Sequence, residues 1–277
     1  MERPIITFLT DFGLDGAAAT CRGVMLSICR DAQIVDIGHT VRKFAIADGA
    51  WILRASLPYM PVGVHVAVVD PGVGTERRPI ALKVARGDLL VGPDNGLLLP
   101  PAEALGGAVE ARTLANRDYW LPATTATFHG RDIFAPVAAH LAAGSAAFDQ
   151  LGPLLALEEL VRLDAPRASV RDGALDTAVI YVDSFGNVRL AGGRDDLAAA
   201  VGALEAEPRL EVALTGANGA VGKREATHFR PTFGHAPVGS SLVYVDSSGG
   251  LALADNQGNA AARLGLAVGD HVRISLA

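Results

Sequence analysis

Three polar side chains of complementary chemistry follow apolar stretches in the first half of the sequence. Asp70 comes directly after the apolar run 64–69, and Arg77 follows it beyond a glycine-rich turn. His129 precedes a stretch typical of a helix, which we expect over 132–143. Open α/β sheets bind ligands at the carboxyl ends of their strands, because side chains converge there. We therefore interpret Asp70 and Arg77 as a carboxylate held against a guanidinium at a sheet edge, although a hairpin with a solvated arginine pair fits the same residues.

The position of His129 favours a neutral imidazole. A helix N-terminus carries partial positive charge, which disfavours protonation of a histidine beside it. Neutral imidazole is the form that a general base requires. The next residue, Gly130, leaves its backbone N–H open to a small ligand. The alternative is a surface histidine beside a helix cap.

Asp11 ends the first apolar run, in the string Thr10-Asp11-Phe12-Gly13. Its carboxylate could accept hydrogen bonds from both hydroxyls of a ribose, or it could cap the helix that follows. Asp15 lies nearby, so the two carboxylates also suggest a metal site. Two carboxylates without a further cluster of ligands are weak evidence for a metal ion, and we predict no metal site.

A second set of polar residues lies in the turns of the second half. Carboxylates there could bind an ammonium group, and amides and hydroxyls could bind a carboxylate, so the set could hold a zwitterion. Each residue alone is as readily ordinary turn chemistry. Phe44 and Phe233 offer flat surfaces for a purine or a sugar, although each could instead belong to the core. Asn95 lies in the turn 93–96 of the first half, and the set of the second half is Asp183, Asn187, Asp246, Ser247 and Asn256.

The elements that must position these residues alternate in type through the first part of the chain. Alternating strands and helices indicate a sheet covered by helices, with a parallel portion. The expected strands are 4–10, 33–37, 64–69, 79–84 and 89–91, and the expected helices are 17–29, 45–57 and 132–143.

Past Gly152 the sequence consists mainly of short alternating runs and turns. The tetrads SFGN (184–187) and SSGG (247–250) each join two such runs, which predicts two β-hairpins. We therefore predict an α/β domain with a central, mostly parallel sheet over 1–165 and a smaller β-barrel-like domain over 175–277. The expected link between the two domains is 165–173.

Composition narrows the classes of protein to which the chain can belong. The 277 residues are 50% hydrophobic and carry a formal net charge of −6. Such a chain can form a core, and it lacks the basic clusters that nucleic acid binding requires. No apolar run reaches the roughly 18 residues of a membrane span. Cys21 and Cys29 lie too far apart on one predicted helix for a disulfide, so we expect core thiols in a cytoplasmic protein that binds small molecules or other chains.

Six motifs occur in order over nearly the whole chain, and together they are far more specific than any one of them. The motifs are Thr10-Asp11-Phe12-Gly13, Val69-Asp70-Pro71-Gly72-Val73-Gly74, Gly92-Pro93-Asp94-Asn95-Gly96, Thr127-Phe128-His129-Gly130-Arg131-Asp132, Asp183-Ser184-Phe185-Gly186-Asn187 and Asn256-Gln257-Gly258-Asn259-Ala260. With these motifs the chain resembles the S-adenosyl-L-methionine (SAM) hydroxide adenosyltransferases, a family related to the SAM-dependent fluorinase and chlorinase.

The resemblance implies a two-domain fold and a homotrimer, in which the N-terminal domain of one subunit meets the C-terminal domain of a neighbour at each active site. It implies a catalytic triad of Asp70, Arg77 and His129. It further implies that Asp11 binds the ribose, Phe44 lies beside the sugar, Asp183, Asn187 and Ser247 contact the methionine moiety, Phe233, Asn256 and Gln257 contact the adenine, and Asn95 and Gly130 also line the substrate.

The chain departs from the fluorinase pattern in several places. The fluorinase has a tyrosine at the position of Asp70 and a halide-contacting serine at that of Gly130. It also carries a long insertion where this chain turns at once through 86–88. The pair Ser247-Ser248 lacks the arginine that the fluorinase has second in its Ser-Arg pair.

The resemblance therefore implies hydrolysis of SAM to adenosine and L-methionine by attack of activated water on the ribose C5′ carbon, with SAM as the substrate and no cofactor. A carboxylate at Asp70 should repel a halide, since two unit charges 4 Å apart cost ~4 kcal/mol at an effective dielectric of ~20. Three alternatives stay open: a SAM-dependent halogenase such as a chlorinase, a non-catalytic SAM or adenosine sensor, and a metal-dependent nucleoside hydrolase. We expect neither nucleic acid nor a membrane as a partner.

Overall fold

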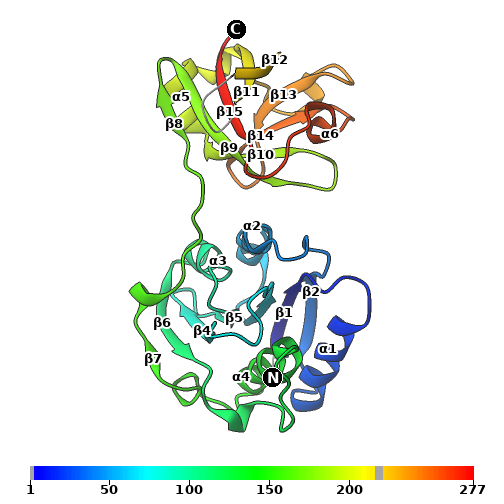
Figure 1. The fold of residues 1–277 in the computed structure, drawn as a ribbon, viewed down its shortest axis with the longest axis vertical. Coiled ribbons are helices and arrows are strands. Elements are labelled where there is room, and N and C mark those ends of the chain that lie inside the picture. The colour runs from blue at the N-terminus through cyan, green and yellow to red at the C-terminus, as the bar shows by residue number, and fades with distance from the viewer. Residues whose placement is uncertain (1–2, 216–220) are drawn as a thin grey trace. The chain divides into compact units, whose positions relative to one another are not determined.

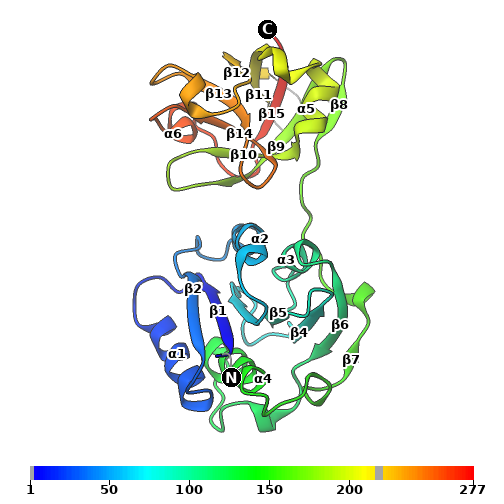
Figure 2. The same cartoon turned by 180° about the vertical axis from the view of Figure 1, so that it is seen from behind.

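The computed structural model describes residues 3–215 and 221–277, and the chain divides into two compact units. The N-terminal unit ends at Leu163 and the C-terminal unit begins at Asp164. Figure 1 and Figure 2 show both units from opposite sides. Each unit has a hydrophobic core of its own.

A seven-stranded sheet forms the centre of the N-terminal unit, in the order β2-β1-β3-β5-β4-β6-β7. β2, β1, β3 and β5 run parallel, and β4, β6 and β7 extend the sheet antiparallel. This arrangement confirms the predicted α/β fold with its parallel central strands. The strands are β1 (Ile5–Thr10), β2 (Gln33–Gly38), β3 (Val64–Val68), β4 (Pro79–Val84), β5 (Leu89–Pro93), β6 (Ala108–Thr113) and β7 (Leu154–Leu155).

Helices cover both faces of this sheet, because alternate residues of a buried strand point to opposite sides. Ile6 and Phe8 of β1 pack with α1 and α4, whereas Leu9 packs with α2 and α3. Cys21 and Cys29 are free and buried, as predicted. The helices are α1 (Ala17–Ile28), α2 (Ile46–Ser56), α3 (Leu99–Ala104) and α4 (Ala135–Ala142).

The parallel register brings the carboxyl ends of the central strands to one edge of the sheet. Thr10 at the end of β1 pairs with Val68 at the end of β3. Asp11 and Asp70 follow these two strands and therefore leave the sheet at the same edge. The edge at which ligands bind in open α/β sheets thus carries both of the predicted carboxylates.

The helix expected over 132–143 begins in a different form. A π-helical turn, Gly130–Phe134, precedes α4, and His129 is its N-cap. Turns of this kind are rare and are frequent at functional sites. Short 3₁₀ helices occur at Leu57–Tyr59, Arg117–Tyr119, Phe148–Gln150, Leu157–Glu159, Leu204–Ala206 and Phe233–His235. Among the residues that the structure describes, no helix has both the length and the apolar composition needed to cross a bilayer.

An eight-stranded antiparallel sheet forms the C-terminal unit, in the order β12-β11-β15-β9-β10-β14-β13, with β8 paired to β9. Its two edges approach each other, since Phe229 bridges Val243 and the Thr227 hydroxyl donates to the Ser241 carbonyl oxygen at 2.7 Å. The nearly closed sheet confirms the predicted β-barrel-like fold. The elements are β8 (Ser169–Arg171), β9 (Ala174–Val182), β10 (Val188–Gly193), α5 (Arg194–Val201), β11 (Arg209–Thr215), β12 (Val221–His228), β13 (Ser241–Val245), β14 (Gly250–Asp255), α6 (Ala260–Leu264) and β15 (His271–Leu276).

Both predicted hairpins are present in this sheet. β9 pairs with β10, and β13 pairs with β14, each pair antiparallel and joined through the predicted tetrad. The stretch that we expected to be a plain link contains the strand β8. Three residues are too few for an alternating pattern to distinguish a strand from a linker.

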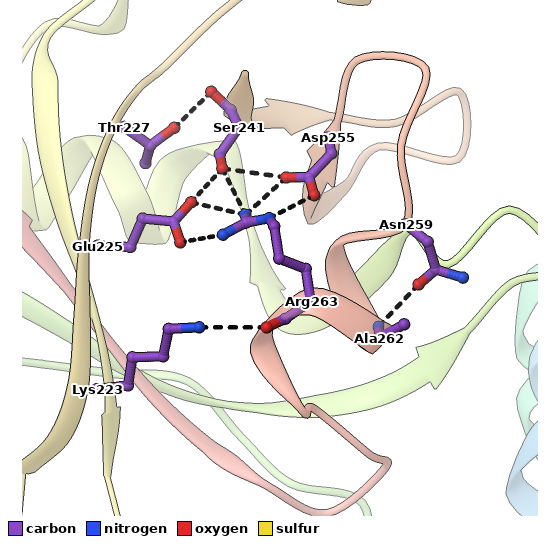
Figure 3. A network of polar contacts seen from close by, with 8 residues as sticks. All are labelled: Lys223, Glu225, Thr227, Ser241, Asp255, Asn259, Ala262 and Arg263. Atoms are coloured by element: carbon purple, nitrogen blue, oxygen red, sulfur yellow. Dashed lines mark hydrogen bonds and ion pairs between the residues drawn. The ribbon is translucent and has the colours of Figure 1, made fainter. Parts of the chain in front are cut away.

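An arginine joins the elements around the seam of the barrel, as Figure 3 shows. Arg263 of α6 donates hydrogen bonds of 2.7 Å to Asp255 of β14, to Glu225 of β12 and to the hydroxyl of Ser241 of β13. The hydrogen bond from Arg263 holds the pKa of Asp255 below its ordinary value. One guanidinium thereby ties three strands to the last helix.

Candidate active site

The structure brings Asp70, Arg77 and His129 together at the edge of the N-terminal sheet. Nε and Nη2 of Arg77 donate to Oδ1 and Oδ2 of Asp70 at 3.1 and 2.5 Å. Nη2 also lies 3.1 Å from Nδ1 of His129. The side chains of Arg77 and Asp70 are only 7% and 4% exposed. A carboxylate and an imidazole thus share one buried guanidinium.

Two loops carry this cluster, and they press against each other at Gly74. Gly74 has a left-handed backbone (φ +78°), and a Cβ there would stand 2.5 Å from the carbonyl oxygen of Ala126. Only glycine fits such an approach without a shift of the backbone. This contact holds the loop of Arg77 against the segment that leads to His129.

A buried carboxylate, Asp132, anchors the second loop. Its Oδ2 accepts hydrogen bonds from the backbone N–H and the hydroxyl of Thr125, both at 2.8 Å, and Arg131 Nε donates to Oδ1 at 2.6 Å. The side chain of Asp132 is 0% exposed. Sequence reasoning gave this residue no role, although it closes the same motif as His129. It fixes the segment from which the imidazole projects.

The contact with Arg77 decides which nitrogen of His129 carries the proton. A guanidinium has only donors, so Nδ1 of His129 accepts, and the proton of the neutral ring lies on Nε2. Burial, followed by the charge of Arg77, lowers the pKa of His129. The sequence predicted a neutral imidazole from the helix terminus, whereas burial and a neighbouring cation are the main causes here.

One donor of Arg77 has no partner. Nη1 is buried and makes no hydrogen bond within the described chain, while the guanidinium carbon lies 5.4 Å from the ring centroid of Phe134. A buried cationic N–H without an acceptor is costly. A small polar ligand or water molecule at Nη1 would remove this cost.

Asp11 and Phe44 form a second contact at the sheet edge. The backbone N–H of Phe44 donates to Oδ2 of Asp11 at 2.9 Å. Phe44 has a left-handed backbone (φ +67°), which is strained for a bulky residue, and it is 69% exposed. A strained, exposed aromatic residue held by a carboxylate is typical of a ligand site. Asp11 does not cap the next helix, because the N-cap of α1 is Gly16.

Asn95 and Gly130 shape the backbone near this edge. Nδ2 of Asn95 donates to the carbonyl oxygen of Val69 at 2.9 Å, and its Oδ1 accepts from the N–H of Leu97 at 3.2 Å. A Cβ at Gly130 would stand 2.8 Å from Cζ of Phe12. Asn95 thus holds the end of β3 against the turn after β5, and Gly130 leaves room for an aromatic ring.

Asp183 and Asn187 lie together in the turn between β9 and β10 of the C-terminal unit. Oδ1 of Asp183 accepts from the N–H groups of Phe185 and Asn187, and Oδ2 accepts from the side-chain amide of Asn187, each at 2.9 Å. This is the chemistry of an ordinary tight turn, and it also holds a carboxylate and an amide at fixed positions.

Phe233, Asn256 and Gln257 lie in the loops of the same unit. The ring of Phe233 packs on that of Tyr244 with 4.9 Å between centroids. Nδ2 of Asn256 donates to the carbonyl oxygen of Ala236 at 2.8 Å, and Gln257 has a left-handed backbone (φ +57°). The aromatic pair means that Tyr244, which sequence reasoning passed over, belongs with the candidate Phe233.

Ser247 lies in the turn between β13 and β14, beside Asp246, which forms an ion pair with Arg189. Arg189 is a further residue that sequence reasoning did not single out. Its charge and that of Asp183 both act on the Tyr244 hydroxyl, whose pKa burial raises. A charged group of the β9–β10 turn and one of strand β10 therefore lie near one phenol.

Enzymatic activity is expected to fall at acidic pH, when the neutral imidazole of His129 becomes protonated. Its pKa is lowered, so the neutral ring persists below the ordinary value of about 6.5, and turnover should decline only at more acidic pH. His129→Asn should remove this decline and reduce kcat about tenfold, because the amide oxygen can still accept from Arg77 but does not titrate. His140, whose pKa burial also lowers, supplies the control His140→Asn. A decline in activity with its midpoint above pH 6.5, or one that persists in His129→Asn, would show that the decline does not report protonation of His129.

Within the described residues, no three His, Cys, Asp or Glu side chains are grouped so that they could hold a metal ion. The edge of the N-terminal sheet carries the buried triad, with a carboxylate and an exposed aromatic residue on neighbouring loops.

Comparisons with known proteins agree with this architecture. The family model described as SAM hydroxide adenosyltransferase N-terminal domain matches residues 6–152, and the C-terminal domain model of the same family matches residues 177–273. An (R)-S-adenosyl-L-methionine hydrolase of Salinispora arenicola is 47% identical over 275 residues, which cover 98% of each chain. A fluorinase of Actinopolyspora mzabensis is 31% identical over 306 residues, covering 99% of this chain and 98% of the relative.

A crystal structure of an uncharacterized conserved protein from Thermotoga maritima superposes with a TM-score of 0.85 at 34% identity, covering 98% of this chain and 99% of that one. Fold and site define a class of two-unit proteins in which a mixed sheet with parallel central strands has a carboxylate, a guanidinium and an imidazole together at one edge. The chain belongs to the SAM hydroxide adenosyltransferase family.

Proposed function

We propose that this protein hydrolyses SAM to adenosine and L-methionine. The observation that carries the proposal is the buried cluster of Asp70, Arg77 and His129, in which one donor of Arg77 has no partner among the described residues. The names of the hydrolase relatives support it, and so does the match of both family models.

The reaction converts a cation and water into neutral or zwitterionic products and one proton. The oxygen of water bonds to the ribose C5′ carbon, the bond from C5′ to sulfur breaks, and sulfur keeps the electron pair as methionine leaves. The released proton goes first to a protein group and then to solvent. Attack by hydroxide on the C5′ carbon of a sulfonium ion destroys charge, so a site that admits the reacting water but excludes bulk solvent favours it.

We propose a separate task for each member of the triad, and the geometry supports this division. Nη1 of Arg77 would hold the attacking water, and the positive charge would lower the pKa of that water. Asp70 would accept the proton, since Nδ1 of His129 already accepts from Arg77 and Nε2 already carries a proton in the neutral ring. His129 would keep the guanidinium in place.

The other predicted residues would bind the substrate. Asp11 would accept from the ribose hydroxyls, with Phe44 beside the sugar and Asn95 and Gly130 shaping the pocket. The methionine moiety would contact Asp183, Asn187 and Ser247, and the adenine would contact Phe233, Asn256 and Gln257. We propose no cofactor and no metal requirement, because the guanidinium supplies the positive charge that activates water.

Adenosine release from SAM, followed by chromatography, tests the function. The hydrolase relatives are named for the (R) epimer at sulfur, so both epimers are compared. We expect adenosine from the (R) epimer, no loss of turnover with a chelator, and no halogenated nucleoside with added chloride. Binding of SAM without any adenosine would favour a sensor, free adenine would favour a nucleoside hydrolase, and 5′-chloro-5′-deoxyadenosine would favour a halogenase.

Asp11→Asn is expected to weaken adenosine binding about 10- to 150-fold, since a hydrogen bond to a charged group contributes about 1.5–3 kcal/mol. The amide keeps the size of the side chain, so the contact with the Phe44 N–H survives. Isothermal titration with adenosine measures the effect, and Asp15→Asn on the following loop is the matched control. Unchanged affinity in Asp11→Asn would show that the ribose is bound elsewhere.

We also propose a homotrimeric, cytoplasmic protein. The proposed substrate residues lie in two different units of the chain, which suits an active site completed by assembly. The free thiols of Cys21 and Cys29 suit a reducing compartment. Light scattering of the purified chain tests the trimer.

A further inference from the structure

We propose that His39 is a positioning residue that holds Asp11 and Phe12 in the arrangement the nucleoside requires. The inference rests on the proposed role of Asp11 as the ribose ligand. His39 follows β2, next to β1 in the sheet, and neither the motifs nor the triad include it.

His39 makes hydrogen bonds on both sides of Asp11. Its Nδ1 lies 2.9 Å from the hydroxyl oxygen of Thr10, and its carbonyl oxygen accepts from the N–H of Gly13 at 2.7 Å. The backbone that carries the carboxylate is therefore fixed at the residue before it and at the second residue after it. The direction of the Asp11 side chain depends on this stretch of backbone.

The Thr10 hydroxyl connects His39 to the backbone of Phe12. The backbone N–H of Phe12 donates to the Thr10 oxygen at 3.2 Å, so the hydroxyl proton is free to point at Nδ1 of His39. Nε2 then carries the imidazole proton and faces Oδ1 of Asp36 at 3.0 Å. Asp36 in turn pairs with Arg22, so the carboxylate that faces the imidazole is itself held by a cation.

The imidazole also supports a row of aromatic rings that leads toward the triad. His39 packs edge-on against Phe8, with 4.9 Å between the ring centroids. Phe12 meets Phe8 at 6.5 Å and Phe128 at 5.6 Å. Phe12 is also the ring that a Cβ at Gly130 would strike. A shift of the segment 10–13 would therefore move both Asp11 and the ring of Phe12, which packs against the start of the π-helical turn at Gly130.

His39 is well placed for this task because its side chain is only 12% exposed. Its edge-on contact with Phe8 and the hydrogen bond between Nδ1 and the Thr10 hydroxyl restrict the orientation of the ring. An aliphatic residue of similar size could fill the space but could not hold the Thr10 hydroxyl. An asparagine could, because its side-chain oxygen occupies roughly the place of Nδ1.

The test measures adenosine affinity by titration calorimetry in His39→Leu and His39→Asn. Misplacement of Asp11 weakens its charge-assisted hydrogen bonds to the ribose, and we expect about a tenfold loss of adenosine affinity in His39→Leu. His39→Asn should restore affinity to within about threefold of the parent chain. His140→Leu, which removes a histidine on α4 whose ring contacts Ser145 and Tyr119, should leave affinity unchanged.

A double-mutant cycle with Asp11→Asn separates positioning from general weakening of the fold. If His39 acts through Asp11, His39→Leu should cost little further affinity once Asp11 is asparagine. Fully additive losses, or no loss in His39→Leu while Asp11→Asn does weaken binding, would overturn the inference. No loss in Asp11→Asn would instead overturn the ribose assignment. Should His39→Leu not fold, as judged by thermal melting, Thr10→Val removes the same hydrogen bond and takes its place in the cycle.

Discussion

Asp70→Asn is expected to lower the rate of adenosine release about a thousandfold, within the 10²–10⁴ range typical of a lost proton acceptor. The amide keeps the shape of the side chain and can still accept one hydrogen bond from Arg77. It has neither the charge nor the basicity to take a proton from water. Because the proposed substrate contacts are elsewhere, SAM affinity should stay nearly unchanged.

The same variant tests why the site would prefer water to a halide. The carboxylate of Asp70 is 4% exposed, so solvent screens it little from an anion nearby. Removing a charge that costs an incoming anion about 4 kcal/mol at 4 Å should permit chloride to bind. We expect Asp70→Asn, incubated with SAM and chloride, to form a detectable chlorinated nucleoside that the parent chain does not form.

Chromatography measures the rates at which adenosine and 5′-chloro-5′-deoxyadenosine form. The control is Asp149→Asn, which changes an exposed carboxylate on a 3₁₀ helix of the same unit. Retention of full hydrolytic activity in Asp70→Asn would falsify the proposed role of this carboxylate. If Asp70→Asn is slow but still forms no chlorinated nucleoside, Asp70 acts in proton transfer only. Another group would then be responsible for the discrimination against halides.

The sequence predicted the location of the triad because local rules place residues at strand ends. Apolar runs predict β1 and β3, and the parallel register of these two strands brings Asp11 and Asp70 to one edge of the sheet. His129 was singled out by its position before a predicted helix, and the resemblance grouped it with Asp70 and Arg77, which lie far away in the sequence. The predicted hairpins of the barrel also follow from local turn chemistry.

Contacts between segments that are distant in the sequence could not be predicted from these local rules. The approach of Gly74 to Ala126 unites the two loops of the triad, and only a three-dimensional arrangement reveals why glycine is needed there. The π-helical turn at Gly130–Phe134 has no simple sequence signal, so a regular helix was expected. In the sequence His39 is an isolated histidine after a short strand. Its hydrogen bond to Thr10 could not be predicted, because the two residues meet only in the folded sheet.

Arg77 is the residue on which the whole cluster depends, because its guanidinium contacts the carboxylate, the imidazole and the proposed water at once. Lysine carries the same charge but has a single nitrogen at the end of a flexible chain, so it cannot reproduce a two-point contact with Asp70 together with a bond to His129. The buried carboxylate would keep a cation nearby, while the imidazole and the water would lose theirs.

Arg77→Lys is therefore expected to lower kcat about a hundredfold or more, with adenosine affinity changed less than threefold, since the loss falls on positioning of the nucleophile. Arg78→Lys is a closely matched control, because the neighbouring Arg78 also makes two hydrogen bonds to a buried carboxylate, Asp94, but has no contact with His129. Both variants should lose some thermal stability through a weakened ion pair, whereas only Arg77→Lys should lose turnover. Equal falls in kcat for the two variants would mean that Arg77 supports the fold rather than the chemistry.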